Sequence, residues 1–156
     1  MENRRIAHMA LDEKTNARCS PQVEHERNVA IYDLLEENFF SPIGGQLGPF
    51  YLHLSNVEGR LIFDVRDAND ADFLSVSVPA KSLRRIISDY FMVCETYFEA
   101  IKTKTPSQIE TIDMGRRGLH DEGAEVLKER LAEHVEVDHH TARRLFTLIC
   151  VLHIKG

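Results

Sequence analysis

The chain has 156 residues, of which 43% are hydrophobic and 28% charged, a composition typical of one globular domain spanning residues 1–156. Its net charge of −6 argues against nucleic acid as a partner. The three cysteines show no CxxC spacing, which argues against a disulfide framework. The N-terminus is charged and no long apolar stretch is present, which argues against a signal peptide and a membrane span. We therefore expect a cytoplasmic protein.

The first fifty residues predict one strand, one helix and one loop. Residues 6–11 form a short apolar run consistent with an edge strand. Ser20 and Pro21 are typical of a helix start, and apolar residues at helical spacing then predict an amphipathic helix over 21–37. Two prolines and three glycines predict a loop over 41–49, because such residues interrupt helices and strands.

The next segment changes from a helical period to strict alternation of apolar and polar residues. Three alternating runs lie at 52–55, 61–66 and 74–78, and polar turns separate them at 56–59 and 67–72. Short turns between alternating runs predict an antiparallel β-meander with one buried face.

The remainder of the chain is predicted to be mainly helical. A broad apolar stripe predicts a long, well-buried helix over 80–103, and Thr105 to Gln108 predict the capped start of the next helix. Residues 135–137 predict a short extended piece, after which Asp138 is expected to cap a last helix over 139–153. Strands and helices fall in separate blocks, so we expect an α+β fold with three antiparallel strands, or four with the N-terminal run, packed against four to five helices.

The segment 113–123 is the strongest candidate for a site, because it combines three glycines, an arginine pair and a His-Asp-Glu run. If Gly115 and Gly118 break the helix, a second helix would begin near His120 and its N-terminus could bind an anion. If the apolar register continues through 106–133, one long helix results, and the two glycines would allow another element to approach closely. The recognition set in this segment is Arg116, Arg117, His120 and Asp121, with His120 as a candidate acid–base group.

Arginine pairs recur along the chain. Besides Arg116–Arg117, pairs occur at Arg84–Arg85 and Arg143–Arg144. If these pairs converge, Arg84, Arg143 and Arg144 would extend the recognition set into a basic pocket for an anionic ligand. Taken singly, each pair is the charged face of an amphipathic helix.

Two other polar clusters are better explained without a ligand. Six potential metal ligands lie within residues 133–140, but their spacing matches no zinc pattern, so we predict no metal and no cofactor. Residues 24–27, Glu-His-Glu-Arg, are predicted to be a solvated helix face.

No catalytic motif is present, so we favour a non-enzymatic binding or protein-interaction module. A protein partner or a homodimer would meet the partly apolar outer face of the meander, which carries Tyr51, His53, Ile62 and Phe73. The alternative is a small enzyme or sensor that binds a phosphate or carboxylate metabolite through the arginine pairs.

Four stretches resemble an uncharacterised family of alphaproteobacterial proteins. They are residues 20–27, 30–38, 113–123 and 141–150, and the resemblance extends over nearly the whole chain. It implies a small bacterial cytoplasmic protein. It implies no particular activity, cofactor or catalytic residue.

Overall fold

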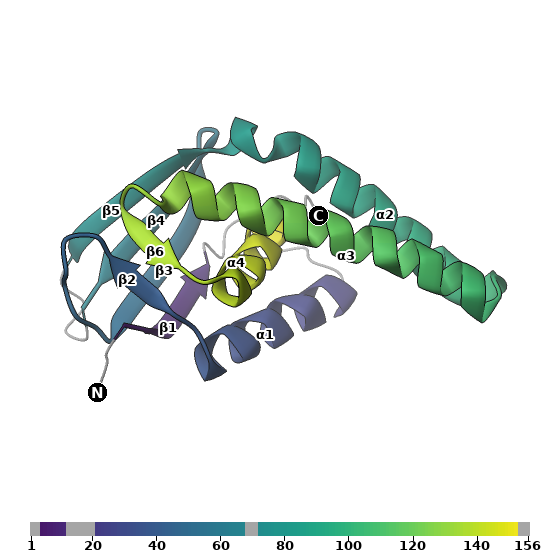
Figure 1. Cartoon of the computed structure of the whole chain (residues 1–156), viewed down its shortest axis with the longest axis horizontal. Coiled ribbons are helices and arrows are strands. Elements are labelled where there is room, and N and C mark those ends of the chain that lie inside the picture. Colours follow the sequence, from purple (N-terminus) through teal and green to yellow (C-terminus); the bar gives the residue numbers. More distant parts are fainter. Residues whose placement is uncertain (1–3, 12–20, 68–71, 153–156) are drawn as a thin grey trace.

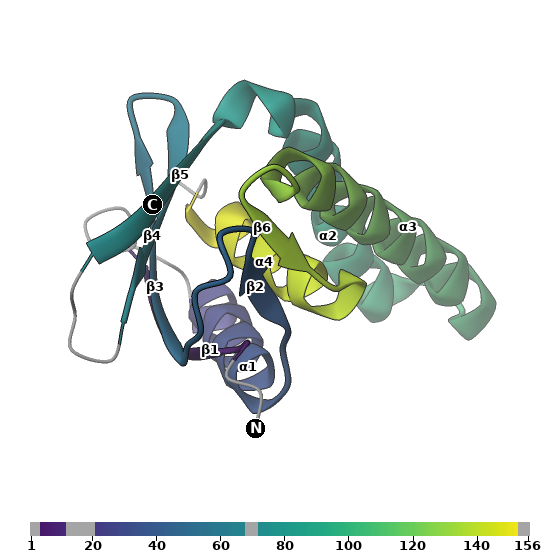
Figure 2. The same ribbon diagram turned by 60° about the vertical axis from the view of Figure 1, so that its left-hand side comes forward.

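The computed structural model describes residues 4–11, 21–67 and 72–152. Within these ranges, a four-stranded sheet with the order β1-β3-β4-β5 and a two-stranded sheet pack with four α-helices. Figure 2 shows that the helices lie on one side of the larger sheet, and no helix of the described residues lies on its other face. The expected α+β class is therefore confirmed, although the larger sheet is mixed and not purely antiparallel.

The predicted meander is confirmed. It consists of β3 (Phe50–Val57), β4 (Arg60–Arg66) and β5 (Asp72–Pro79), paired antiparallel in that order. Glu58 and Gly59, with φ of 50° and 81°, form the turn between β3 and β4. Two consecutive residues with positive φ match the twist of a tight hairpin. The second predicted turn lies mostly outside the described residues.

The N-terminal strand β1 (Ile6–Leu11) joins the sheet at its edge, as predicted, but it runs parallel to β3. The antiparallel expectation was wrong for this strand. In the sequence, α1 lies between β1 and β3, and it returns the chain to the end of the sheet at which β1 begins, so that β3 runs in the same direction as β1. Asn38, just after α1, extends the edge: its side chain accepts a hydrogen bond from Ile6 N at 2.6 Å and donates one to Ile6 O at 3.0 Å.

The predicted loop over 41–49 was wrong at its first two residues. Phe40–Pro42 forms the short strand β2, which pairs antiparallel with β6 (Val135–Val137). The predicted extended piece at 135–137 is confirmed. Pro42 is tolerated because Phe40 N, two residues earlier, donates to Arg4 O, so the missing N–H of Pro42 is also on the side away from β6.

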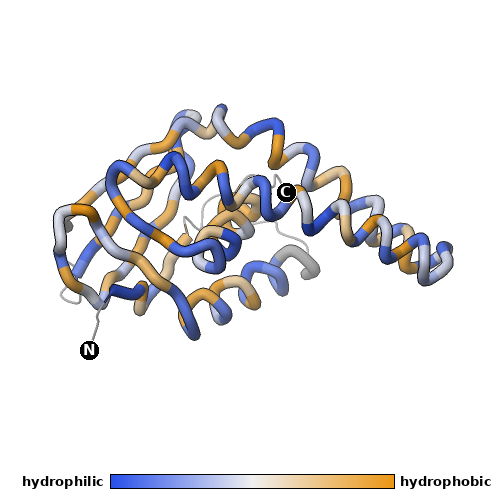
Figure 3. The backbone as a smooth tube through the Cα atoms, viewed as in Figure 1, coloured by the Kyte–Doolittle hydropathy of each residue, from blue (hydrophilic) through white to orange (hydrophobic). Residues whose placement is uncertain are grey.

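Two of the helices pack directly beneath the larger sheet. They are α1 (Pro21–Glu36) and α4 (His139–Leu152), close to the predicted ranges. Asp138 caps α4 as expected, since its carboxylate accepts a hydrogen bond from Thr141 N at 2.9 Å. Most residues of α4 are buried, so this helix is the centre of the core (Figures 1 and 3).

The other two helices form an antiparallel pair that projects beyond the sheet (Figure 1). A short 3₁₀ turn, Ala80–Ser82, precedes α2 (Arg84–Thr103), and α3 spans Pro106–Leu131. The expectation that the helix over 80–103 is well buried was wrong for its second half. Ile101 is 52% exposed there, because the pair of helices extends beyond the sheet and, among the described elements, α2 packs mainly against α3.

Of the two alternatives that the sequence left open over 106–133, the structure has the single unbroken helix, α3. Thr105 and Gln108 form the predicted capping box at its start. The expected close approach at Gly115 and Gly118 was wrong, because a Cβ at either position would meet nothing within 4 Å. The close approach occurs instead at Gly123, where a Cβ would overlap the ring of Phe146 on α4.

No helix in the described part of the chain has the length and apolar character that a membrane crossing needs.

Candidate ligand-binding site

A polar cleft of about 340 Å³ lies among α1, α3 and α4, with Tyr90 of α2 contributing to its wall. This volume is within the range of small-molecule sites. Apolar and charged side chains both line it. The lining residues are His25, Glu26, Val29, Ala30, Asp33, Tyr90, Arg116, Arg117, His120, Arg143, Arg144 and Thr147.

The structure brings two of the three candidate arginine pairs together in this cleft. Arg116 and Arg117 come from α3, and Arg143 and Arg144 come from α4. The remaining candidate, Arg84, is exposed at the start of α2 and does not line the cleft. The convergence that the sequence could not decide therefore involves four arginines from two helices.

Asp113 holds the two arginines of α3. Arg116 donates to Asp113 Oδ1 from Nε at 3.0 Å and from Nη2 at 2.6 Å, and Arg117 Nε lies 3.1 Å from Oδ2. The hydrogen bond from Arg116 lowers the pKa of the Asp113 carboxyl below its usual value. The guanidinium of Arg116 also lies over the Tyr97 ring, 4.8 Å from its centroid. These contacts fix the direction of both side chains.

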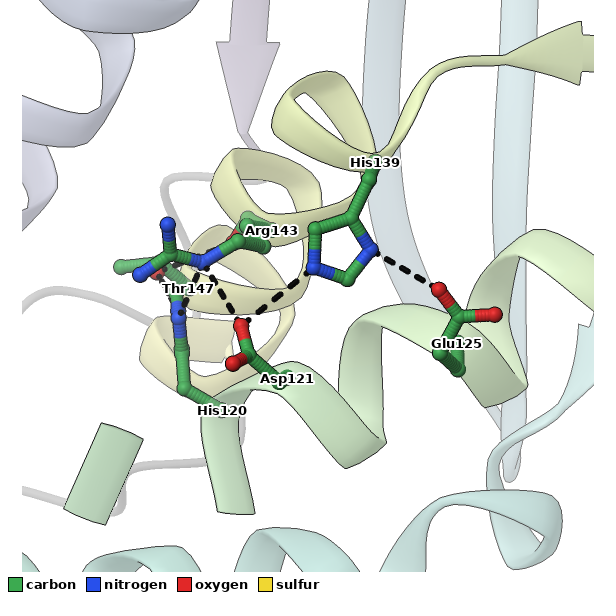
Figure 4. Close-up of polar contacts among 6 residues, drawn as sticks. All are labelled: His120, Asp121, Glu125, His139, Arg143 and Thr147. Atoms are coloured by element: carbon green, nitrogen blue, oxygen red, sulfur yellow. Dashed lines mark hydrogen bonds and ion pairs between the residues drawn. The ribbon is translucent and has the colours of Figure 1, made fainter. Parts of the chain in front are cut away.

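His120 holds the first arginine of α4 (Figure 4). Arg143 Nε donates to His120 Nδ1 at 3.3 Å, and His120 Nε2 lies 2.6 Å from Thr147 Oγ1. Since the Thr147 hydroxyl donates to the Arg143 carbonyl at 3.2 Å, Nε2 must carry the imidazole hydrogen and Nδ1 must accept. Both ring nitrogens are therefore engaged, and His120 is arranged to orient Arg143.

The environment of His120 favours its neutral form. The ring is buried and packs against the rings of Tyr90 and Phe146, with centroids 5.5 and 5.7 Å away. Burial, and next the charge of Arg143, lower the His120 pKa from 6.5 to about 4. A neutral ring agrees with the hydrogen-bond pattern, because an imidazolium would have no acceptor to offer Arg143.

Asp121 lies behind the cleft, where it supports Arg143. Its Oδ1 is 3.2 Å from Arg143 Nε and 3.3 Å from His139 Nε2, while His139 Nδ1 is 2.9 Å from Glu125 Oε2. Carboxylates only accept hydrogen bonds, so both contacts of His139 are made when both ring nitrogens are protonated. Asp121, a site candidate from the sequence, thus contacts Arg143 but does not line the cleft (Figure 4).

Arg144 connects the cleft to α1, because its Nη2 lies 3.7 Å from Asp33 Oδ2. With this contact, each of the four arginines has an acidic neighbour: Asp113 for Arg116 and Arg117, Asp121 for Arg143, and Asp33 for Arg144.

The cluster over 133–140 is dispersed by the fold. Asp138 caps α4, His139 faces α3, and the side chains of Glu133, His134 and Glu136 are exposed. Across the described residues, no group of three or more His, Cys, Asp or Glu side chains is arranged to hold a metal ion.

Sequence reasoning missed three side chains that line the cleft. Glu26 was interpreted as part of a solvated face, yet it is half-buried and lines the cleft; Tyr90 and Thr147 were not considered as site residues. Thr147 follows Arg143 by four residues, and this spacing on a helix was the available signal. Glu26 gave no comparable signal, since its burial depends on α3 and α4.

A mixed sheet covered on one face by helices, with four arginines gathered in one cleft, defines an α+β protein with a candidate anion site. The chain belongs to the family described as "Uncharacterised protein family (UPF0262)", whose match covers residues 3–155. This finding confirms the family resemblance seen in the sequence.

The relatives are alphaproteobacterial proteins of the same length class. The UPF0262 protein of Paramagnetospirillum magneticum is 57% identical over 152 residues, which cover 97% of each chain. That of Rhodospirillum rubrum is 62% identical over 146 residues, or 94% of this chain and 90% of the relative. One from Rhodopseudomonas palustris is 53% identical and covers 99% of this chain and 94% of its own length. No solved structure matches the chain.

Proposed function

We propose that the protein is a non-enzymatic binding protein whose ligand is a small carboxylate or phosphate compound held in the cleft among α1, α3 and α4. The observation that carries this proposal is the convergence of Arg116, Arg117, Arg143 and Arg144 on one small-molecule-sized cavity. Guanidinium groups recognise carboxylates and phosphates through paired, charge-assisted hydrogen bonds.

The way the arginines are held supports a receptor for an anion. Arg143 uses Nε for His120 and Asp121, and among the described residues neither of its Nη atoms has a hydrogen bond or ion pair. Arg117 likewise uses Nε for Asp113. A guanidinium group whose Nε is already held, and whose Nη atoms are available, is oriented before the ligand arrives. Such a side chain loses little conformational entropy when an anion binds.

The charge balance favours a small ligand over a polyanion. Glu26 and Asp33 line the same cleft, and Asp113 and Asp121 neutralise part of the arginine charge from outside it. A nucleic-acid surface needs a broad basic footprint, which this arrangement lacks.

The geometry of His120 supports binding over catalysis. A general base needs a nitrogen lone pair directed at a substrate proton. In His120, the lone pair on Nδ1 accepts from Arg143 and the hydrogen on Nε2 is donated to Thr147. We therefore assign His120 the role of positioning Arg143.

The interaction with a protein partner or a second copy is the second candidate function. Its support is the sheet face on which no helix of the described residues packs, where Tyr51, His53 and Ile62 are half-buried (Figure 2). The side chain of Phe73 lies outside the described residues. A strictly monomeric mass by light scattering would remove the homodimer.

A cytoplasmic location is part of the proposal. Cys94 and Cys150 both have free thiols, in keeping with a reducing compartment.

The test is isothermal titration calorimetry with inorganic phosphate, citrate and glutarate. We expect saturable binding of at least one anion, and Arg143→Ala should weaken it at least tenfold because a charge-assisted pair is lost. Arg84→Ala is the matched control, since Arg84 is an exposed arginine outside the cleft. Equal effects of the two variants, or no binding either of these three anions or of the amine-bearing anions tested below, would contradict the proposal.

A further inference from the structure

Glu26 is the unusual member of the cleft. It is a half-buried carboxylate on α1, in a cavity that also holds four arginines. Nevertheless, among the described residues it makes no hydrogen bond and no ion pair within 4 Å, whereas Glu24 on the same helix pairs with Arg27. Placing a carboxylate in a partly desolvated site without a partner costs free energy.

The arginines do not compensate Glu26, because other acids already orient them. Arg116 and Arg117 are turned to Asp113, Arg143 to Asp121 and Arg144 to Asp33. Burial accordingly raises the Glu26 pKa, and the charges of Arg116 and His25 offset only part of this increase. Among the described residues, the cleft therefore offers guanidinium N–H groups and a carboxylate that make no hydrogen bond or ion pair.

A ligand that satisfies both features must carry an anionic group and a cationic hydrogen-bond donor. A primary ammonium fits a carboxylate that lacks a partner, since it supplies three donors and a full positive charge. Val29, Ala30 and Tyr90 add an apolar wall suited to a short carbon chain. A plain dianion would meet repulsion from Glu26 and Asp33.

We propose that the ligand is a small zwitterion of the amino-acid type, with its carboxylate or phosphate on the arginines and its ammonium on Glu26. This inference rests on the proposed function, because it specifies what kind of anion the cleft takes.

The experiment compares ligands that differ only by the ammonium group. One pair is glutamate and glutarate, and the other is phosphoethanolamine and ethyl phosphate, so that carboxylate and phosphate sources are distinguished. In at least one pair, calorimetry with the full chain should show about tenfold tighter binding of the amine-bearing member.

The isosteric variant Glu26→Gln removes the charge that the ammonium needs. We expect it to abolish the preference within the pair and to tighten binding of the deamino anion, because one repulsive charge is lost. Glu24→Gln, on the exposed side of α1, should keep the preference of the unmodified protein.

Two results would overturn the inference. If the deamino member of each pair binds as tightly as its partner and Glu26→Gln changes nothing, the ligand is a simple anion and the proposed function survives. If none of the four compounds binds, and phosphate and citrate also fail, both the inference and the proposed function fall.

Discussion

The two halves of α3 belong to one continuous helix but have opposite surroundings. In the second half, His120, Gly123, Ala124, Leu127 and Leu131 are buried against α4 and the sheet. In the first half, no residue is buried, and Met114 is 62% exposed. One continuous helix can therefore be packed very differently along its length. Tertiary contacts with α4 and the sheet stabilise the second half, while the capping box and α2 stabilise the first half.

The candidate site lies where these two halves meet. Arg116 and Arg117 belong to the exposed half and His120 to the buried half. An arginine at this boundary can keep its guanidinium accessible to a ligand while its neighbours in the core fix the helix.

The largest expected difference between the halves is the cost of removing an aromatic anchor. Phe146 is fully buried and its ring contacts those of Tyr90 and His120. Phe146→Ala should lower the free energy of unfolding by about 3–5 kcal/mol, since it leaves a cavity under the second half of α3. Urea unfolding followed by circular dichroism measures this loss.

The matched control at the projecting end is Ile101→Ala, because Ile101 is 52% exposed on α2. We expect a change within about 0.5 kcal/mol. If Phe146→Ala does not fold, Phe146→Leu replaces it with a smaller loss. Similar losses at the two positions would mean that the projecting end is as tightly packed as the core.

The second expected difference depends on pH. The folded-state pKa of His120 is about 4, below its usual 6.5, so the unfolded chain takes up a proton first as the pH falls. The contribution to stability is complete above about pH 6.5 and is lost as the pH falls toward 4. The loss is on the order of 3 kcal/mol.

Urea unfolding at a series of pH values checks this expectation. His120→Gln supplies a side-chain amide that can form hydrogen bonds but does not titrate. The free energy of unfolding of this variant should therefore change less with pH than that of the unmodified protein. His134→Gln, at an exposed position beyond the end of α3, should keep the steep profile. An unchanged profile in His120→Gln would show that the folded protein protonates this ring as readily as the unfolded chain does.

Local periodicity predicted most elements of the fold, because alternation and helical spacing are properties of short segments. It identified the meander, α1 and the cap of α4. The direction of β1 could not be predicted from its six residues, since pairing direction depends on where α1 returns the chain.

The sequence predicted only those features of the site that are visible in short segments. Arginine pairs are visible in the sequence, and two of them do converge. Glu26 was assigned to a solvated face because its neighbours Glu24, His25 and Arg27 are all polar. Only the packing of α1 beside α3 and α4 makes it a half-buried residue, and packing between distant segments has no local signature.

The smallest expected difference concerns the glycines of α3. Sequence reasoning predicted a close approach of another element at the wrong glycines. Gly123→Ala should destabilise the protein by about 1–3 kcal/mol, because the added Cβ overlaps the Phe146 ring and forces a shift. Gly115→Ala should stabilise it by about 1 kcal/mol, since the site is open and alanine is the better helix former. Both free energies come from urea unfolding.

Opposite signs are the essential result, because the two substitutions are chemically identical and lie on one helix. Gly118→Ala serves as the replicate of Gly115→Ala, as its Cβ would also meet open space. Destabilisation at Gly115 and Gly118 would show that another element packs on the first half of α3. That surface would then belong with the buried half, and the arginines beside it would be less accessible to a ligand than the cleft requires.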